Sequence, residues 1–349
     1  NERLYTNPSS RNDILQYLCG SNDYSRCCCH SFKSKIKAPK MSKNDKEFTE
    51  HYVAEFSKEV SFDELPDAPP SGKFRLSLTG KLGAVVVTFW VFIAVFGQFM
   101  APYHENDIPF PDDYMEFQPP KPGAILGTDR DDRDVLSRLM YGASRTIGIS
   151  FTATVLAYIV GVTFGIGSAV LGGRVDTIIS GINNIFLSLP TIMLGLVIVA
   201  AVGSTIPILI ITAGLIYATV VFRLARAIAM DVKVMDFVEV SKGRGENLWW
   251  IISKEIWPNV RMPLISDFGL RLIYVILFVS SLSFLGLGVQ PPMADWGSMV
   301  KENLGALQYG ESVLSVVAPA FSIATLTVAI NLIVDDVSAH AGGKLTKRL

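Results

Sequence analysis

Cysteine is absent from most of this chain, because all four cysteines precede Met41. The sequence from Met41 to Leu349 therefore has no disulfide and no thiolate metal site, which argues against redox chemistry there. The cysteines are Cys19, Cys27, Cys28 and Cys29. His30 makes a Cys/His cluster with them, but their adjacent spacing suits no common zinc site. We predict no metal ligands.

Charged residues are also scarce, at 18% of 349 residues, whereas half of the chain is hydrophobic. With a mean hydropathy of +0.36, this composition indicates a membrane protein. The formal net charge of −1 gives no indication of nucleic-acid binding, which a basic stripe would show.

The chain lacks a phosphate-binding loop, which needs Gly-Lys followed by Ser or Thr. Its three Gly-Lys pairs are followed by Phe74, Leu82 and Leu345. If ATP is the source of energy, another chain must therefore hydrolyse it. We predict no catalytic residue and no cofactor.

Six apolar stretches approach the about 20 residues that a helix needs to cross a bilayer. They are Leu82–Ala101, Ile147–Leu171, Ile185–Val202, Ile206–Phe222, Leu272–Val289 and Val313–Val334. None of them contains Asp, Glu, Lys, Arg or His. Secondary transporters and channels often carry ionisable groups at membrane depth, and a membrane-embedded enzyme needs catalytic groups there. The sequence thus predicts an all-α membrane protein with six transmembrane helices and an external energy source.

Basic residues predict a cytoplasmic N-terminus. The first stretch follows Lys73 and Lys81 and lacks a small-residue cleavage site, so we expect an uncleaved anchor. The segment Arg223–Arg271, with eight Lys/Arg, would share that side. The segment Pro102–Thr146 would be external, yet it holds five Lys/Arg residues. Its acidic residues do not offset them, because orientation follows the basic residues and acidic residues contribute little.

A charged segment, Asp236–Asn259, which we call the charged loop, lies between the fourth and fifth apolar stretches. Asp236 is placed to accept a backbone hydrogen bond at a helix start, and Glu239, three residues on, to return one, as in a capping box. The sequence therefore predicts a short helix from Asp236.

A turn and a second helix are expected next. Gly243 and Gly245 allow a sharp turn, and Asn247 can cap a helix that Pro258 ends. The sequence thus predicts helix, turn and helix at the membrane surface.

Three segments together resemble one known family. Glu239-Val240-Ser241, Gly245 and Ile256-Trp257-Pro258-Asn259 resemble the Glu-Ala-Ala loop of bacterial ABC importer permeases. Leu126–Thr146 and Phe284–Val300 resemble the C-type permease subunit of dipeptide, oligopeptide and nickel importers. The resemblance covers roughly residues 73 to 336 and implies an ABC type I importer permease fold.

The chain departs from the family pattern at three places. Val240 and Ser241 replace the two usual alanines, Asp132 stands where a glycine usually precedes Arg133, and Val334-Asp335-Asp336 replaces Gly-Asp-Gly. The first change could alter docking to a partner, and Asp132 would affect a turn in the external segment.

By the resemblance, the charged loop is a coupling helix that seats in a groove of an ATPase subunit. Glu239 and Gly245 would shape the docking turn, with Arg244 and Glu246 available for polar contacts. The alternative is a solvated loop whose glutamate only caps its own helix. The predicted ATPase-docking loop comprises Asp236, Glu239, Ser241, Arg244, Gly245, Glu246, Pro258 and Asn259.

The resemblance further implies the permease subunit of an ATP-driven importer that moves peptides, or a related small solute such as nickel, across the bacterial inner membrane by alternating access. The implied partners are a second permease subunit, two ATPase subunits and a periplasmic or lipid-anchored substrate-binding protein. The alternative is a stand-alone secondary transporter or channel.

The domain organisation follows from composition at the N-terminus and from the resemblance over residues 73–336. We interpret residues 1–40 as a non-native or disordered leader and residues 41–72, which are acidic and contain proline, as a flexible cytoplasmic tail. Residues 73–336 would form the transmembrane permease domain and residues 337–349 a cytoplasmic C-terminal tail.

Two external segments have alternative interpretations. Leu126–Thr146 is either a family-specific element near the outer mouth or, slightly favoured, an amphipathic connector whose Arg133 and Arg138 face lipid headgroups. Gln290–Trp296 either meets a substrate-binding protein or is a rigid connector.

Small and aromatic residues suggest packing and anchoring roles. Gly161, Gly165 and Ala169 form a ridge that suits close helix packing. Trp249 and Trp250 are more typical of interfacial anchors than of ATPase contacts.

Overall fold

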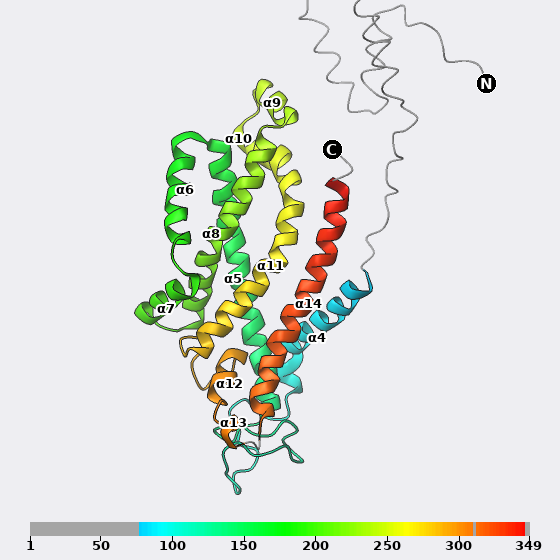
Figure 1. Cartoon of the computed structure of the whole chain (residues 1–349), viewed down its shortest axis with the longest axis vertical. Helices are drawn as coiled ribbons and strands as arrows, with labels where there is room; N and C mark the ends of the chain where they lie inside the picture. Colours follow the sequence, from blue (N-terminus) through cyan, green and yellow to red (C-terminus); the bar gives the residue numbers. More distant parts are fainter. Residues whose placement is uncertain (1–76, 310–311, 346–349) are drawn as a thin grey trace, which may run out of the picture. The chain divides into compact units, whose positions relative to one another are not determined.

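The computed structural model describes residues 77–309 and 312–345. The leader and the tail that we predicted over residues 1–40 and 41–72 lie outside this range. Within it the protein is helical and has no β-strand, which confirms the all-α prediction (Figure 1). The helices are α4 (Leu78–Met100), α5 (Val135–Leu171), α6 (Gly173–Leu187), α7 (Thr191–Val202), α8 (Ile206–Lys233), α9 (Asp236–Gly243), α10 (Leu248–Trp250), α11 (Trp257–Phe284), α12 (Trp296–Glu302), α13 (Ala306–Tyr309) and α14 (Leu314–Leu345).

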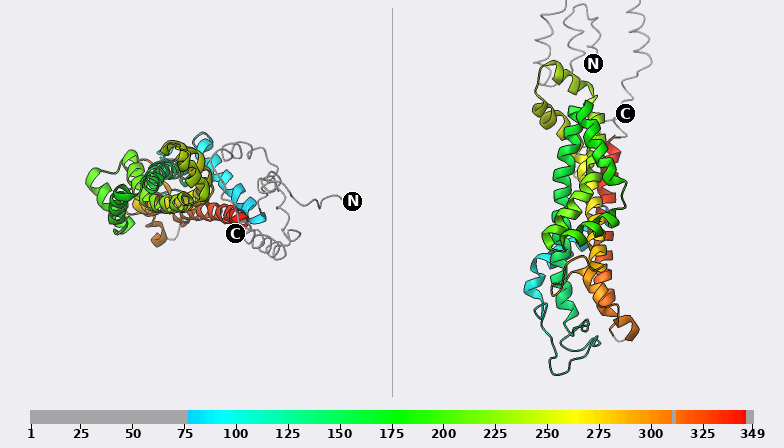
Figure 2. Two further views of the ribbon diagram at one scale, coloured as in Figure 1. Left: turned by 90° about the horizontal axis from the view of Figure 1, so that it is seen from above. Right: turned by 90° about the vertical axis from the view of Figure 1, so that its left-hand side faces the viewer.

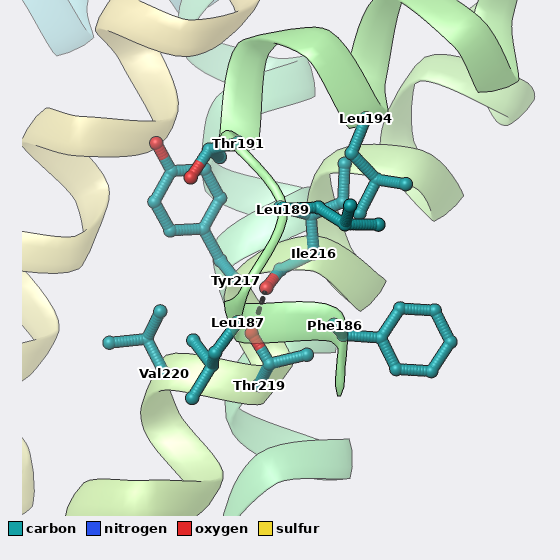
Figure 3. Close-up of a pocket in the computed structure, with 9 residues that line it drawn as sticks. All are labelled: Phe186, Leu187, Leu189, Thr191, Leu194, Ile216, Tyr217, Thr219 and Val220. Carbon is teal, nitrogen blue, oxygen red and sulfur yellow. Dashed lines mark hydrogen bonds between the residues drawn. The ribbon is translucent and has the colours of Figure 1, made fainter. Parts of the chain in front are cut away.

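Five described helices are long and apolar enough to span a membrane, and α6 with α7 makes a sixth if this bent pair counts as one span. The prediction of one continuous helix over Ile185–Val202 is wrong, because α6 and α7 meet at 87°. Pro190 at the bend lacks an N–H group and disfavours a helical conformation at Leu189. A small cavity that both Tyr217 and Thr191 line adjoins this bend (Figure 3).

Helices α5 and α8 run parallel, since Gly161 lies against Ala218 and Val221 whereas Gly165, one turn further, lies against Phe222 and Ala225. The chain must therefore return across the membrane between them. The bent pair α6–α7 supplies that crossing, so the connectivity agrees with six spans. The predicted glycine ridge is confirmed as the surface on which these two helices pack.

The helices are longer than the predicted apolar stretches: α5 begins at Val135, α8 reaches Lys233 and α14 reaches Leu345. These longer helices contain ionisable residues, whereas the predicted apolar stretches contain none. Four of these charges form the salt bridges Asp176–Arg226 and Asp267–Arg271.

The segment between α4 and α5 lies at the end opposite α9 (Figure 2), where the Arg130 backbone N–H donates to Asn303 Oδ1, just after α12, at 3.3 Å. Arg138 pairs with Asp129 at 2.9 Å and with Glu302 at 3.0 Å, and Arg133 pairs with Asp129 at 2.9 Å. Arg133 and Arg138 are both buried, so the prediction that they face headgroups is wrong. We call Asp129, Arg133, Arg138 and Glu302 the outer ion cluster, after their place at the end of the molecule opposite α9.

The connector Gln290–Trp296 is divided between surface and interior. Gln290 and Met293 are exposed. Trp296 is fully buried, donates from Nε1 to the Leu139 carbonyl at 3.0 Å and packs edge-on against Trp90. The end of this connector is therefore held rigidly against α4 and α5.

The departure from Gly-Asp-Gly near the end of α14 also has a structural role. Asp336 accepts a hydrogen bond from the Ser77 backbone N–H at 2.9 Å, and its carboxylate lies beside Gly80. It thereby joins α14 to the start of α4.

Replacing Asp132 by glycine is expected to stabilise the protein by about 1 kcal/mol, measured as a higher melting temperature in detergent. Asp132 has a φ of +58°, which disfavours residues with a Cβ, and it is fully buried. Burial raises the pKa of its carboxyl group, so ionisation there opposes folding. Asp132→Asn removes only the charge and should give a smaller gain. A lower melting temperature for Asp132→Gly would contradict the assignment of strain.

Candidate functional site

The charged loop forms the predicted helix, turn and helix at the end of the molecule opposite α12 and α13 (Figure 1). Val238 of α9 is fully buried and packs in one cluster with Ile251, Ile256 and Val260. The loop is therefore seated on the membrane helices and moves with α8 and α11.

The predicted capping box at the start of α9 is wrong. Met235 occupies the N-cap position, and no side-chain hydrogen bond caps this helix. Asp236 and Glu239 instead lie exposed in the first turn, where the helix dipole favours acidic side chains. Both carboxylates are thus available at the surface.

The turn after α9 agrees with the prediction. Gly245 has a φ of +83°, and a Cβ added there would meet no atom within 4 Å, so backbone conformation alone favours glycine. Asn247 caps the second helix, because its Oδ1 accepts from the Trp250 backbone N–H at 2.7 Å.

Pro258 does not end the second helix, contrary to the prediction. A π-helical turn over Ile251–Ile256 joins α10 to α11, so the helix runs on through Pro258, whose missing N–H falls at the first turn of α11. Asn259 donates from Nδ2 to the Glu255 carbonyl at 2.6 Å. Pro258 and Asn259 therefore lie on a continuing helix and not in the turn.

Glu255 is a site residue that the sequence analysis missed. Its Oε1 accepts from Ser241 Oγ at 2.8 Å, and Arg244 donates to the same Oγ at 3.1 Å. The Arg244 guanidinium also lies 5.5 Å from the Trp250 ring. These contacts brace α9 against the following helix. The serine that replaces a usual family alanine thus supplies a bond that alanine cannot make.

The exposed face of the loop combines apolar and charged groups. Its apolar members are Phe237, Val240, Leu248 and Trp249, which together we call the loop patch. Asp236, Glu239 and Lys242 are exposed beside it. Glu246 is partly buried in the turn. This arrangement can bind another protein by apolar burial and ion pairing, and the described residues hold no group of side chains suited to a metal ion.

Comparisons with known proteins agree on one family. The family described as binding-protein-dependent transport system inner membrane component matches residues 161–340. A putative peptide transport system permease protein of Brucella suis is 33% identical over 293 residues, covering 81% of this chain and 95% of the relative. The dipeptide transport system permease protein DppC of Alkalihalophilus pseudofirmus is 30% identical over 256 residues, covering 73% and 82%.

Among solved structures, the MetNI methionine ABC transporter in an inward-facing conformation matches with a TM-score of 0.43 and 20% identity. That match covers 57% of this chain and 95% of the matched chain.

Proposed function

Because the chain belongs to the family of binding-protein-dependent transport system inner membrane components, we propose that it is the permease subunit of an ATP-driven importer that carries peptides, or a related small solute, across the bacterial inner membrane by alternating access. The observation that carries this proposal is the 33% identity to a putative peptide permease over 95% of that relative's length. No catalysis is assigned to this chain, and separate ATPase subunits would hydrolyse ATP.

The N-terminus and the α9–α10 loop are assigned to the cytoplasm. Basic residues are concentrated in the segment Arg223–Arg271, whose central part forms this loop. The opposing basic residues of the external segment are largely used within the fold: Arg133 and Arg138 lie in the outer ion cluster, and Arg145 pairs with Glu105. They are therefore weaker signals of orientation than their number suggests.

The assembly would contain a second permease, two ATPase subunits and a periplasmic or lipid-anchored substrate-binding protein. The loop patch is the surface that fits the ATPase, because it exposes apolar side chains beyond the membrane helices. The acidic first turn and Arg244 would add polar contacts. Residues 73–336 would form the permease domain, and the segments on either side would be cytoplasmic.

Replacing Val240 by aspartate is expected to weaken ATPase binding at least ten-fold, because a charge would enter the apolar part of the contact. Val240 is 55% exposed, so the change should leave the fold intact. The full-length chain would be purified from native membranes under a tag, and the recovered ATPase activity and partner chains would be measured, together with ATP-dependent uptake of a labelled dipeptide.

Ile125→Asp provides the matched control, since Ile125 is 69% exposed in the external segment between α4 and α5. This variant should retain both the ATPase and the second permease. Equal ATPase recovery with Val240→Asp would reject the docking site. A wild-type chain that purifies alone and moves solute without ATP would reject the importer and favour a stand-alone transporter.

A further inference from the structure

A charged and aromatic group lies inside the membrane region, where α5, α8 and α11 meet. Asp267 and Arg271 of α11 form a bidentate salt bridge with N–O distances of 2.9 to 3.2 Å. Tyr158 of α5 donates to Asp267 Oδ2 at 2.8 Å. Tyr217 of α8 donates to the Tyr274 carbonyl at 3.0 Å. This group therefore ties three helices together.

The depth of the group follows from Tyr158. This residue lies near the middle of the apolar stretch Ile147–Leu171. At 1.5 Å per helical residue it is about 17 Å from one end of the stretch and about 20 Å from the other. Asp267, bonded to Tyr158, lies at the same level. Ionisable groups at this depth are costly against lipid and normally face protein or a water-filled path.

The group is only partly covered by this chain. The side chains of Asp267 and Arg271 retain 11% and 19% of their accessible surface, and Tyr274 is 49% exposed. Phe268 packs edge-on against Tyr158 at a centroid distance of 5.0 Å. An exposed face with charged and phenolic groups at mid-membrane is unfavourable toward lipid chains, so it must meet the second permease, water or a polar ligand.

The chemistry of this face suits a peptide backbone. Asp267 fixes Arg271 through Nε and Nη2, and no residue that the structure describes accepts from Nη1. The Arg271 guanidinium lies 5.5 Å from the Tyr274 ring. A planar guanidinium and an exposed phenol both donate to carbonyl oxygens, while the adjacent rings can cover amide planes.

We propose that Arg271 and Tyr274 form a weak binding site for the backbone carbonyl oxygens of peptide cargo on the wall of the translocation path. Asp267 and Tyr158 are positioning residues that hold Arg271. Because Asp267 neutralises Arg271, the site does not trap a terminal carboxylate, and weak binding permits passage. This inference rests on the proposed function. Tyr217 continues the wall toward the α6–α7 bend, where it lines the cavity of Figure 3.

Thiol accessibility tests the proposal, because every cysteine precedes Met41 and can be replaced by serine in the full-length chain. Tyr274→Cys and Leu277→Cys, on the exposed face of α11, would each be introduced into the assembled importer in membrane vesicles. Phe321→Cys is the control, at an exposed apolar position of α14. The rate of thiol modification by a charged, water-soluble methanethiosulfonate would be measured in the presence of binding protein and ATP. Each measurement would be made with and without a saturating dipeptide.

The two α11 thiols should react, and the dipeptide should slow their reaction at least three-fold, while the α14 thiol stays unmodified in both conditions. Leu277→Cys keeps the test valid if Tyr274→Cys fails to assemble. Thiols on α11 that react no faster than the control, or that react at the same rate with and without dipeptide, would overturn the site. Wild-type importer that moves no dipeptide with ATP would instead reject the proposed function.

Discussion

Replacing Arg138 by alanine is expected to destabilise the protein by about 3–5 kcal/mol, because removing one partner of a buried ion pair leaves charges without compensation. Arg138 is 1% exposed and contacts both Asp129, which is equally buried, and Glu302. The variant would leave Arg133 as the remaining basic member of the outer ion cluster. The measurement is thermal unfolding in detergent at pH 7.

Arg130→Ala is the matched control, since Arg130 is exposed in the same segment, and it should change stability by no more than about 0.5 kcal/mol. The Arg138→Ala loss should shrink at lower pH. Burial already raises the pKa of Glu302, so its protonation as the pH falls removes the unpaired charge. Equal effects of the two variants, or a loss that grows as pH falls, would contradict this account.

Replacing Gly165 by leucine is expected to cost about 3 kcal/mol or more, because the side chain has no space between α5 and α8. A Cβ at Gly165 would lie 2.8 Å from the Phe222 carbonyl oxygen and 3.1 Å from the Arg226 backbone nitrogen. Backbone atoms cannot move aside as a flexible side chain does. The helices would have to separate, which should lower both the melting temperature and the yield of folded protein.

Gly167→Leu separates this steric effect from helix propensity. Gly167 lies in the same helix, and a Cβ there would meet no atom within 4 Å. Leucine favours helix over glycine by several tenths of a kcal/mol, so this variant should be neutral or slightly stabilising. Comparable losses at both glycines would show that close packing at Gly165 is not the cause.

The sequence was sufficient for those features that depend on local chemistry. Hydropathy and length indicated the membrane helices, and the turn at Gly245 with the cap at Asn247 followed from backbone preference and hydrogen bonding. The Asp236 capping box failed because Met235 took the cap position. Glu255 could not be found, since no local spacing predicts that it meets Ser241 across the turn.

Hydropathy also misplaced the helix limits, for a physical reason. A stretch defined by apolar residues stops at the first charge, so the predicted fifth span began at Leu272, one residue beyond Arg271. In the folded protein Asp267 pairs with Arg271 and neutralises its charge. A hydropathy average over the sequence does not include this ion pair. Ionisable groups are therefore present at membrane depth in α11, contrary to the prediction. The assignment as a permease rests on membership of the family.

The glycine contact between α5 and α8 makes these two helices one rigid body. Arg138 lies in the first turn of α5, and the C-terminal end of α8 leads directly into α9. At 1.5 Å per residue, the 37 residues of α5 span about 55 Å. A displacement imposed on α9 should therefore reach the outer ion cluster as a tilt of the whole unit, with little local bending along its length.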